Sequence, residues 1–231
     1  FNTRIKRMSV PVPPANDNES AIRLLAKVPQ ITALFWLTKI FATTFGETAG
    51  DALSMSLNLG YLTSTFIFAG IFIGLVCLQI RAKHYHPYLY WFTIIASTTV
   101  GTTLADFLDR SLGIGYFGGS AILLTLLIAT LYIWRTVEGS ISPYALQWPR
   151  AEWLYWLTIT FSQTLGTALG DWSADSAGLS YAGGMVLFSA LILLVVALFY
   201  FTEISKTLLF WAAFVLTRPL GAVVGDFLDK P

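Results

Sequence analysis

Residues 35–51 read FWLTKIFATTFGETAGD, and the frame of this stretch recurs three more times along the chain. Within it, Gly46 lies ten residues after Trp36, and Asp51 lies fifteen residues after Trp36. The same spacings join three later sets: Trp91, Gly101 and Asp106; Trp156, Gly166 and Asp171; and Trp211, Gly221 and Asp226. Four matches without a gap identify an internal repeat, and such a repeat sets the architecture before any other feature is considered.

The composition is that of a membrane protein. The 231 residues are 55% hydrophobic and only 12% charged, whereas about 25% of the residues in an ordinary soluble domain are charged. Apolar runs of about 20 residues, the length that crosses a bilayer as a helix, lie at about 31–50, 61–80, 88–106, 116–134, 153–171, 181–202 and 207–226. We therefore predict an all-α polytopic membrane protein with seven visible spans.

Each repeat supplies two of these spans, a helix from Trp to Asp and a returning helix. All four repeats therefore point the same way across the membrane, as parallel two-helix repeats. We divide the chain into a polar N-terminal tail with a short interfacial helix, 1–26, and a membrane domain, 27–231, with repeats at about 30–84, 85–139, 150–204 and 205–231. The fourth repeat is incomplete, and the repeat pattern predicts an eighth span that is missing or truncated here.

Lysine and arginine are distributed unevenly between the two ends of the spans. Ten of them lie beside the Trp ends or in the N-terminal tail, and only Arg110 and Lys230 lie beside the Asp ends. Loops rich in Lys and Arg stay in the cytoplasm. The distribution therefore predicts a multi-pass protein whose N-terminus and Trp ends are cytoplasmic and whose Asp ends face outward.

The acidic residues gather at the Asp ends. On a helix that turns about 100° per residue, the positions 3, 7, 11 and 15 residues after Trp fall on one face, which holds Lys39, Arg218, Glu47 and the four repeat Asp residues. Such a polar stripe cannot face lipid and must turn toward the other repeats. The candidate ion-binding or proton-relay residues are Asp51, Asp106, Asp171, Asp226, Glu47 and Asp109.

Three interpretations of these carboxylates stay open. Clustered carboxylate oxygens bind hard divalent cations such as Mg²⁺, Mn²⁺ or Ca²⁺, which makes a divalent cation the candidate metal and cofactor. Crowded carboxylates also hold protons and form proton relays. In the third interpretation each Asp has a structural role, either bonding to the backbone of the turn that follows it, as Asp often does, or pairing with Arg218 and Lys39.

Arg218 and Lys39 are the basic residues within the spans. Arg218 lies on the acidic face, where it would act as a counter-ion or gate a path; Lys39 lies nearer the Trp end, where its long side chain could also reach the membrane surface. The sequence has no His-x-x-x-His, Cys-x-x-Cys or nucleotide-binding loop, and no arrangement of a nucleophile with a base is visible. We therefore predict that the protein is not an enzyme and binds no nucleic acid.

The repeat frame resembles a bacterial family described as four tandem repeats of unknown function, whose members are labelled only "membrane-anchored protein". The resemblance rests on the repeated aromatic-Trp…Gly…Gly/Ala-Asp pattern, the Lys27-Val28-Pro29 segment and the block Thr217-Arg218-Pro219-Leu220-Gly221. It covers about residues 27–231 and implies two spans and one Trp per repeat, with an eighth span. It implies no activity, substrate or catalytic residue.

These observations lead to two functional expectations. The first is a bacterial inner (plasma) membrane transporter or permeation protein for a small cation, either a divalent metal or a proton-coupled ion, with the acidic cluster near the outer face. The second is a non-transporting scaffold, or a subunit of a larger membrane complex, with structural Asp turns. The expected partners are the lipid bilayer and further membrane subunits, either copies of the chain itself or other proteins.

Overall fold

The computed structural model describes residues 27–144, 146 and 148–230, and the regular structure of these residues is helical throughout. Its long helices are α2 (Ala33–Asp51), α3 (Tyr61–Arg81), α4 (Pro87–Asp106), α5 (Gly115–Glu138), α6 (Pro149–Asp171), α7 (Ser180–Phe201) and α8 (Lys206–Asp229). They correspond one to one with the predicted spans. The predicted tail and its interfacial helix, 1–26, lie outside the described residues.

Four of the helices, α3, α5, α7 and α8, are long and apolar enough to cross a membrane, judged by length and composition. The helices α2, α4 and α6 have similar lengths but carry many buried polar side chains, such as the threonine-rich run 98–103 in α4. Polar side chains are tolerated at this depth where they turn inward. The chain is therefore an all-α polytopic membrane protein built from parallel two-helix repeats, as predicted.

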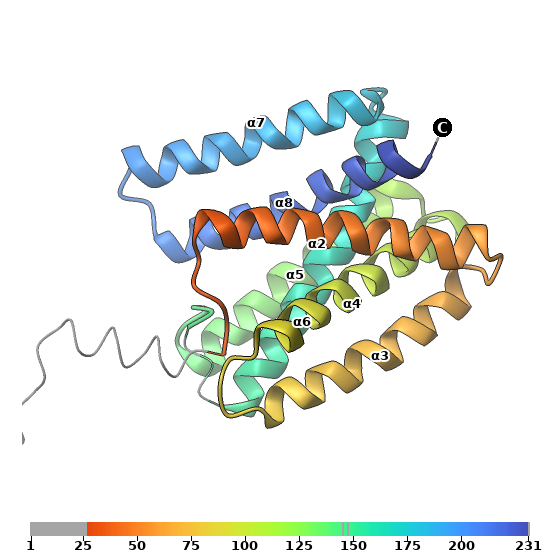
Figure 1. The fold of residues 1–231 in the computed structure, drawn as a ribbon. Coiled ribbons are helices and arrows are strands. Elements are labelled where there is room, and N and C mark those ends of the chain that lie inside the picture. The colour runs from red at the N-terminus through yellow and green to blue at the C-terminus, as the bar shows by residue number, and fades with distance from the viewer. Residues whose placement is uncertain (1–26, 145, 147, 231) are drawn as a thin grey trace, which may run out of the picture.

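The Trp-to-Asp helices of the four repeats form a closed ring. Helix α2 packs against α4, α4 against α6, α6 against α8, and α8 returns to α2. In Figure 1, α2 and α8 lie next to one another and start on the same side of the molecule. The ring turns the polar face of each helix toward its interior, where lipid does not reach it.

The returning helices surround the ring, and each packs against the ring helix of the next repeat: α3 on α4, α5 on α6, and α7 on α8. Figure 1 shows α7 and α3 at opposite edges of the molecule. Helix α2 has no such cover among the described helices. Nine residues after the repeat Trp, Phe45 of α2 is 61% exposed, whereas Val100, Leu165 and Leu220 are only 5%, 2% and 8% exposed. Helix α2 therefore presents an apolar face that its three counterparts keep covered.

Glycine allows the ring helices to approach one another closely. A Cβ atom on Gly101 of α4 would lie 2.9 Å from the backbone of Gln163 in α6, and one on Gly221 of α8 would overlap the Thr43 side chain of α2. Gly101 and Gly221 hold the same repeat position. The same close contact thus joins α4 to α6 and closes the ring between α8 and α2, as small residues do in many membrane helix pairs.

In the first three repeats the ring helix widens into a π-helical turn directly after its Asp. These turns are Ala52–Ser56, Phe107–Ser111 and Trp172–Ser176. Each is followed by a residue with positive φ at an equivalent position, namely Gly60, Gly115 and Ser180. The chain therefore leaves the ring in the same way each time, through a type of turn that is rare and often marks a functional segment.

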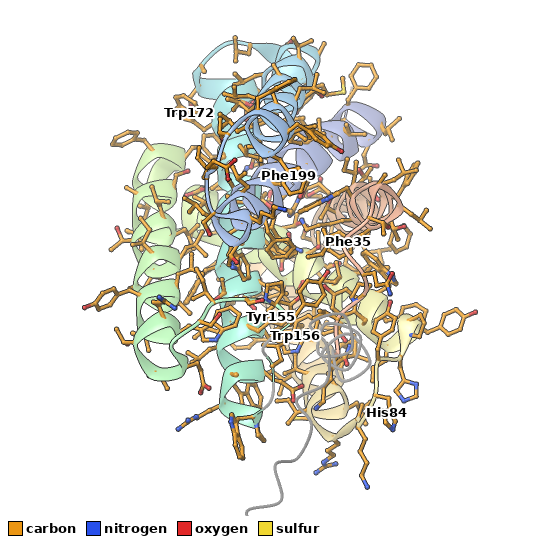
Figure 2. All side chains as sticks on the ribbon, turned by 90° about the vertical axis from the view of Figure 1, so that its left-hand side faces the viewer. Phe35, His84, Tyr155, Trp156, Trp172 and Phe199 are labelled. Atoms are coloured by element: carbon orange, nitrogen blue, oxygen red, sulfur yellow. The ribbon has the colours of Figure 1, made fainter. Side chains whose placement is uncertain are left out.

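Aromatic side chains fill the Trp end of the ring. The buried residues that precede each repeat Trp are Phe35, Tyr90, Tyr155 and Phe210. The hydroxyls of Tyr90 and Tyr155 share a hydrogen bond of 2.7 Å, and Trp156 and Trp211 are each 3% exposed. Figure 2 shows Tyr155 and Trp156 within the bundle and His84 at its edge. The Trp end is therefore part of the packed core.

Candidate functional site

The interior of the ring is lined by every fourth residue of each ring helix. Counted from the repeat Trp, these are positions 3, 7, 11 and 15, and the side chains at all of them are buried. They are Lys39, Thr43, Glu47 and Asp51 of α2; Ile94, Thr98, Thr102 and Asp106 of α4; Ile159, Gln163, Thr167 and Asp171 of α6; and Phe214, Arg218, Ala222 and Asp226 of α8. Acidic side chains are confined to the last two of these positions, at the Asp end.

Among the side chains at these four positions, Lys39 is the charged one that lies nearest the Trp end. Its ammonium donates to the Phe214 carbonyl at 3.0 Å and to the Thr217 hydroxyl at 2.8 Å, and it lies 4.0 Å from the centre of the Phe214 ring. Lys39 is fully buried, so it does not reach the membrane surface. The ion pairs of the described residues do not join it to a carboxylate.

Glu47 and Arg218 form a buried ion pair deeper in the ring. A guanidinium nitrogen of Arg218 lies 2.5 Å from the Glu47 carboxylate, and neither side chain is more than 1% exposed. The same nitrogen donates to the hydroxyls of Thr102 and Thr167, which hold the repeat position of Glu47. Charge-assisted hydrogen bonds thus tie all four ring helices to one another at this level.

Two basic residues join the four repeat Asp carboxylates in pairs. The guanidinium of Arg110 lies 3.2 Å from Asp106 and 3.3 Å from Asp171, which links the end of α4 to the end of α6. The Nε of Arg110, which faces Asp106, also donates to the Tyr116 hydroxyl at 3.2 Å, and Nη1 donates to the Tyr61 hydroxyl at 3.4 Å. Asp106, Asp171 and Arg110 are termed the arginine half of the Asp end.

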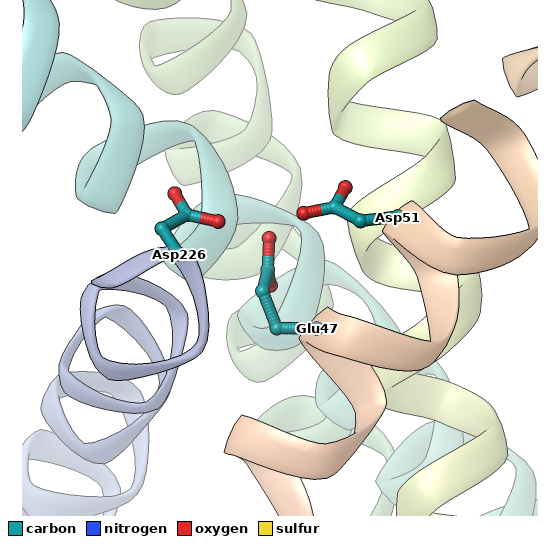
Figure 3. Close-up of side chains that lie close together, drawn as sticks. All are labelled: Glu47, Asp51 and Asp226. Atoms are coloured by element: carbon teal, nitrogen blue, oxygen red, sulfur yellow. The ribbon is translucent and has the colours of Figure 1, made fainter. Parts of the chain in front are cut away.

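The lysine half of the Asp end consists of Asp51, Asp226 and Lys230. The Lys230 ammonium lies 2.7 Å from Asp226 and 3.1 Å from Asp51, which links the end of α8 to the end of α2. Glu47 extends toward the same two carboxylates (Figure 3), and one oxygen atom from each of the three acids lies within 4.8 Å of the other two. This spacing suits three oxygen ligands of one hard cation.

Several oxygen atoms of this group have no partner. Glu47 Oε1, Asp51 Oδ1 and Asp226 Oδ2 are buried, and neither a hydrogen bond nor an ion pair reaches them from the described residues. A buried carboxylate oxygen without a partner is costly. These three residues therefore fit a bound cation, which would supply the missing partner.

Negative charge exceeds positive charge at the Asp end. Glu47 and the four repeat Asp residues supply five carboxylates, and within the described part of the chain three bases contact them, namely Arg218, Arg110 and Lys230. If all eight groups are ionised, two negative charges remain in a buried region where Coulomb interactions are strong. Two protons or one divalent cation would neutralise this remainder.

Two groups outside the membrane-spanning helices have shifted pKa values. Burial disfavours the charge of Lys230, but Asp226 and Asp51 outweigh that effect and raise the pKa of Lys230 above its usual value. Burial raises the pKa of Asp109 to about 6, although the neighbouring Arg110 acts in the opposite direction. Lys230 is therefore protonated at neutral pH, and its charge is available to the two carboxylates.

Asp109 does not join the cluster. It lies in the π-helical turn after α4, and a Cβ atom on Gly119 of α5 would overlap its carboxylate. Both carboxylate oxygens are buried without a hydrogen bond from the described residues. The side chain thus faces a returning helix, while Asp51, Asp106 and Asp171 face the bases of the ring.

The repeat Asp side chains do not cap the turns that follow them. Asp51, Asp106 and Asp171 each precede a π-helical turn, and none of the three makes a side-chain capping hydrogen bond to it. The expectation that each Asp bonds to its own turn is therefore wrong for these three. The physical reason is that a charged base lies within ion-pair distance of each carboxylate.

Sequence reasoning alone does not identify Arg110 and Lys230 as partners of the repeat Asp residues. Both lie four residues after a repeat Asp, which is about one helical turn and a usual spacing for ion pairs on a helix. This shared spacing is the feature of the sequence from which the two ion pairs within a repeat could have been predicted. Their links to the neighbouring repeat depend on the order of helices in the ring, which the sequence does not display.

The chain is thus a polytopic helical membrane protein whose four Trp-to-Asp helices form a closed ring, with carboxylates from every repeat at one end. The chain belongs to the family described as "Repeat of Unknown Function (DUF347)", whose model matches residues 34–85, 89–140, 154–205 and 209–230. Each match begins two residues before a repeat Trp. Searches of curated proteins and of solved structures gave no match.

Proposed function

We propose that this protein transports a small cation across a bacterial inner (plasma) membrane. The cation would bind at the cluster of Glu47, Asp51, Asp106, Asp171 and Asp226. The observation that carries the proposal is that these five carboxylates, each at most 2% exposed, face only three bases among the residues that the structure describes. Buried carboxylates are expensive in a membrane and mark ion pathways and proton relays.

The helix ends favour a cation at this place. Helices α2, α4 and α6 run toward the cluster and continue into a π-helical turn just after the repeat Asp, so the negative halves of three helix dipoles lie on this side of the ring. Transporter sites use C-terminal helix ends and backbone carbonyls to bind cations in a similar manner. Carboxylate oxygens suit a hard divalent metal and crowded carboxylates hold protons, so the cluster suits a divalent metal or a proton-coupled ion.

Arg218 and Lys39 would form the barrier to the cation. Both are buried in the ring and lie between the acidic cluster and the Trp end, and a fixed positive charge excludes cations from a pore. Passage would therefore require Arg218 to leave the Glu47 carboxylate. In this proposal the Glu47–Arg218 ion pair is the gate.

The proposed orientation follows from the charges outside the ring. Ten Lys and Arg residues lie beside the Trp ends or in the N-terminal tail, against two beside the Asp ends. The N-terminus and the Trp ends would thus face the cytoplasm. The cation would then reach the cluster from the outer face of the membrane.

Ion flux into proteoliposomes tests the proposal. Purified protein is reconstituted, and uptake of Mg²⁺, Mn²⁺, Ca²⁺, Na⁺ and K⁺ is measured with and without a pH gradient. Asp106→Asn removes one carboxylate of the cluster and should lower flux by about tenfold or more. Asp229→Asn, at an exposed acid near the end of α8, should leave flux unchanged. Absence of flux for every ion would rule out transport.

One observation favours a second function, that of a subunit in a larger membrane complex. The side chains of Leu34, Phe41 and Phe45 lie exposed along one face of α2, where the other ring helices are covered by a returning helix. A partner helix packed on this face would make the protein a scaffold. A stable complex in mild detergent that Phe45→Ser dissociates, together with no ion flux, would favour this second function.

A further inference from the structure

Arg110 and Lys230 occupy equivalent places in two of the repeats. Each lies nineteen residues after its repeat Trp, and each joins the Asp of its own repeat to the Asp of the next repeat around the ring. Met55 and Asp175 hold the same position in the other two repeats. The Asp end therefore consists of two similar halves, whose bases differ in how they are held.

Arg110 is held from several sides. Besides Asp106 and Asp171, it contacts the hydroxyls of Tyr61 and Tyr116, and its guanidinium carbon lies 5.9 Å from the centre of the Tyr116 ring. A planar guanidinium with several directed partners is a permanent counter-ion, because its fork fits carboxylates and its face stacks on aromatic rings. The arginine half is thus a fixed part of the structure.

Lys230 is held by two carboxylates. Its ion-pair partners in the described residues are the carboxylates of Asp51 and Asp226. It is the C-cap residue of α8: its backbone N–H donates to the Asp226 carbonyl at 2.8 Å, and its backbone is extended rather than helical. An ammonium on a flexible four-carbon stem exchanges its partners more readily than a guanidinium fork.

We propose that Lys230 is a tethered competitor for a divalent cation that binds to Glu47, Asp51 and Asp226. The proposal rests on the proposed function and assigns the cation to the lysine half of the Asp end. On binding, the cation displaces the ammonium from Asp51 and Asp226, and the lysine stem turns toward solvent. The unpartnered oxygens Glu47 Oε1, Asp51 Oδ1 and Asp226 Oδ2 complete the ligand set.

The lysine half suits the cation better than the arginine half does. Glu47 supplies a third carboxylate beside Asp51 and Asp226, whereas Thr102 and Thr167 hold its repeat position in α4 and α6. A divalent ion brings one more positive charge than the ammonium that it replaces, and it binds carboxylate oxygens at about 2.0–2.6 Å. Competition from Lys230 keeps the affinity low enough for the ion to leave again, which a transporter requires.

Cation binding to the purified full chain in detergent tests the competition. Titration calorimetry with Mn²⁺, Mg²⁺ and Ca²⁺, at fixed pH and ionic strength, compares the wild type with Lys230→Gln. Loss of the competing ammonium should tighten the binding of at least one of these ions by about tenfold or more. Addition of Asp51→Asn to Lys230→Gln should remove the gain, because it removes a ligand.

Two control variants separate competition from a general change of charge. Lys206→Gln removes an exposed lysine at the start of α8 and should leave the affinity unchanged. Arg110→Gln removes the equivalent base of the arginine half and should tighten binding much less than Lys230→Gln does. Equal affinities of the wild type and Lys230→Gln for all three ions, or no detectable binding by either, would overturn the proposal. A gain of equal size in Arg110→Gln would overturn it too.

Failure of the competitor proposal can be distinguished from failure of the transport proposal by combining the binding and flux experiments. If the wild type transports an ion but the wild type and Lys230→Gln bind cations with equal affinity, the transport proposal stands and the competitor role of Lys230 is rejected. Tighter binding in Lys230→Gln, combined with no flux in proteoliposomes, would retain the divalent site with its competitor and remove transport.

Discussion

The two ends of the ring are stabilised by different interactions. At the Trp end, the aromatic residues that precede the repeat Trp residues pack in edge-on and tilted contacts, as Tyr90 does against Trp91 and Phe210 against Trp36. At the Asp end, Arg110 and Lys230 hold four carboxylates by ion pairs. Aromatic packing responds little to ions in solution, whereas interactions between charges depend on salt and on bound ions.

This difference separates stability from function along the same four helices. Each ring helix supplies an aromatic side chain at one end and a carboxylate at the other, sixteen residues further on. The aromatic end keeps the ring closed, and the charged end has groups that an ion can rearrange by binding one arrangement more tightly. Substitutions at the Trp end should therefore change stability, and substitutions at the Asp end should change the response to ions.

The largest expected effect is the loss of a buried Trp at the Trp end. Trp156 contacts the rings of Phe72, Tyr90 and Tyr155 and is almost fully buried. Trp156→Ala leaves a cavity and should lower the free energy of unfolding by about 4 kcal/mol. Thermal denaturation in detergent measures the change, and Trp148→Ala, at an exposed Trp, should cost less than about 0.5 kcal/mol. A large change in cation affinity of folded Trp156→Ala would contradict the separation of the two ends.

The second effect is the loss of the fixed base at the Asp end. Arg110→Gln leaves Asp106 and Asp171 without a base. Breaking a buried ion pair costs about 3–5 kcal/mol, and the 29% exposure of the Arg110 side chain lowers the expected cost to about 2–3 kcal/mol. The matched control is Arg150→Gln, at an ion-paired arginine that is 66% exposed, which should cost less than about 1 kcal/mol. Equal thermal midpoints for the two variants would show that the bridge does not stabilise the fold.

The repeat spacing predicts much of the difference between the Trp end and the Asp end of the ring. Trp, Gly and Asp at fixed intervals place Phe35 and Asp51 at opposite ends of one helix, and parallel repeats bring equivalent residues to the same end. The polar stripe predicts which face turns inward. An aromatic end, an acidic end and a buried interior are therefore implied by the sequence.

The partners of individual charges are not implied by the repeat. Lys39 lies on the polar stripe, but its ammonium bonds to the Phe214 carbonyl, a partner that depends on the contact of α2 with α8. Asp109 falls on the same stripe when residues are counted at about 100° each. The π-helical turn after Asp106 has more residues per turn than an α-helix, so the count fails there and Asp109 faces Gly119 of α5.

A single hydrogen bond at the Trp end gives the third test. Tyr90→Phe removes one hydroxyl and leaves the Tyr155 hydroxyl buried without its partner. An unpaired buried hydroxyl costs about 1–3 kcal/mol, so we expect a loss of about 2 kcal/mol. The double variant with Tyr155→Phe removes both hydroxyls and should regain most of this loss. A double-mutant cycle of thermal midpoints measures the coupling, and additive losses would show that the two hydroxyls do not depend on one another.

The smallest expected effect is the pH response of Asp109, at the edge of the Asp end. Its pKa is about 6 in the folded protein and about 3.9 in an unfolded chain. Between these values the folded protein binds more protons, so stability falls as the pH rises through this window. A rise from about 3.9 to about 6 corresponds to roughly 3 kcal/mol, and solvent screening at this half-buried turn lowers the expected value to about 1 kcal/mol. Asp109→Asn removes this loss and should therefore stabilise the protein by about 1 kcal/mol near pH 7.5, but hardly near pH 4. Thermal midpoints across this range measure the difference, and Asp229→Asn should follow the wild type. A difference that does not vary with pH would mean that Asp109 titrates as it does in the unfolded chain, and the pH response of the Asp end would then belong to the ring carboxylates.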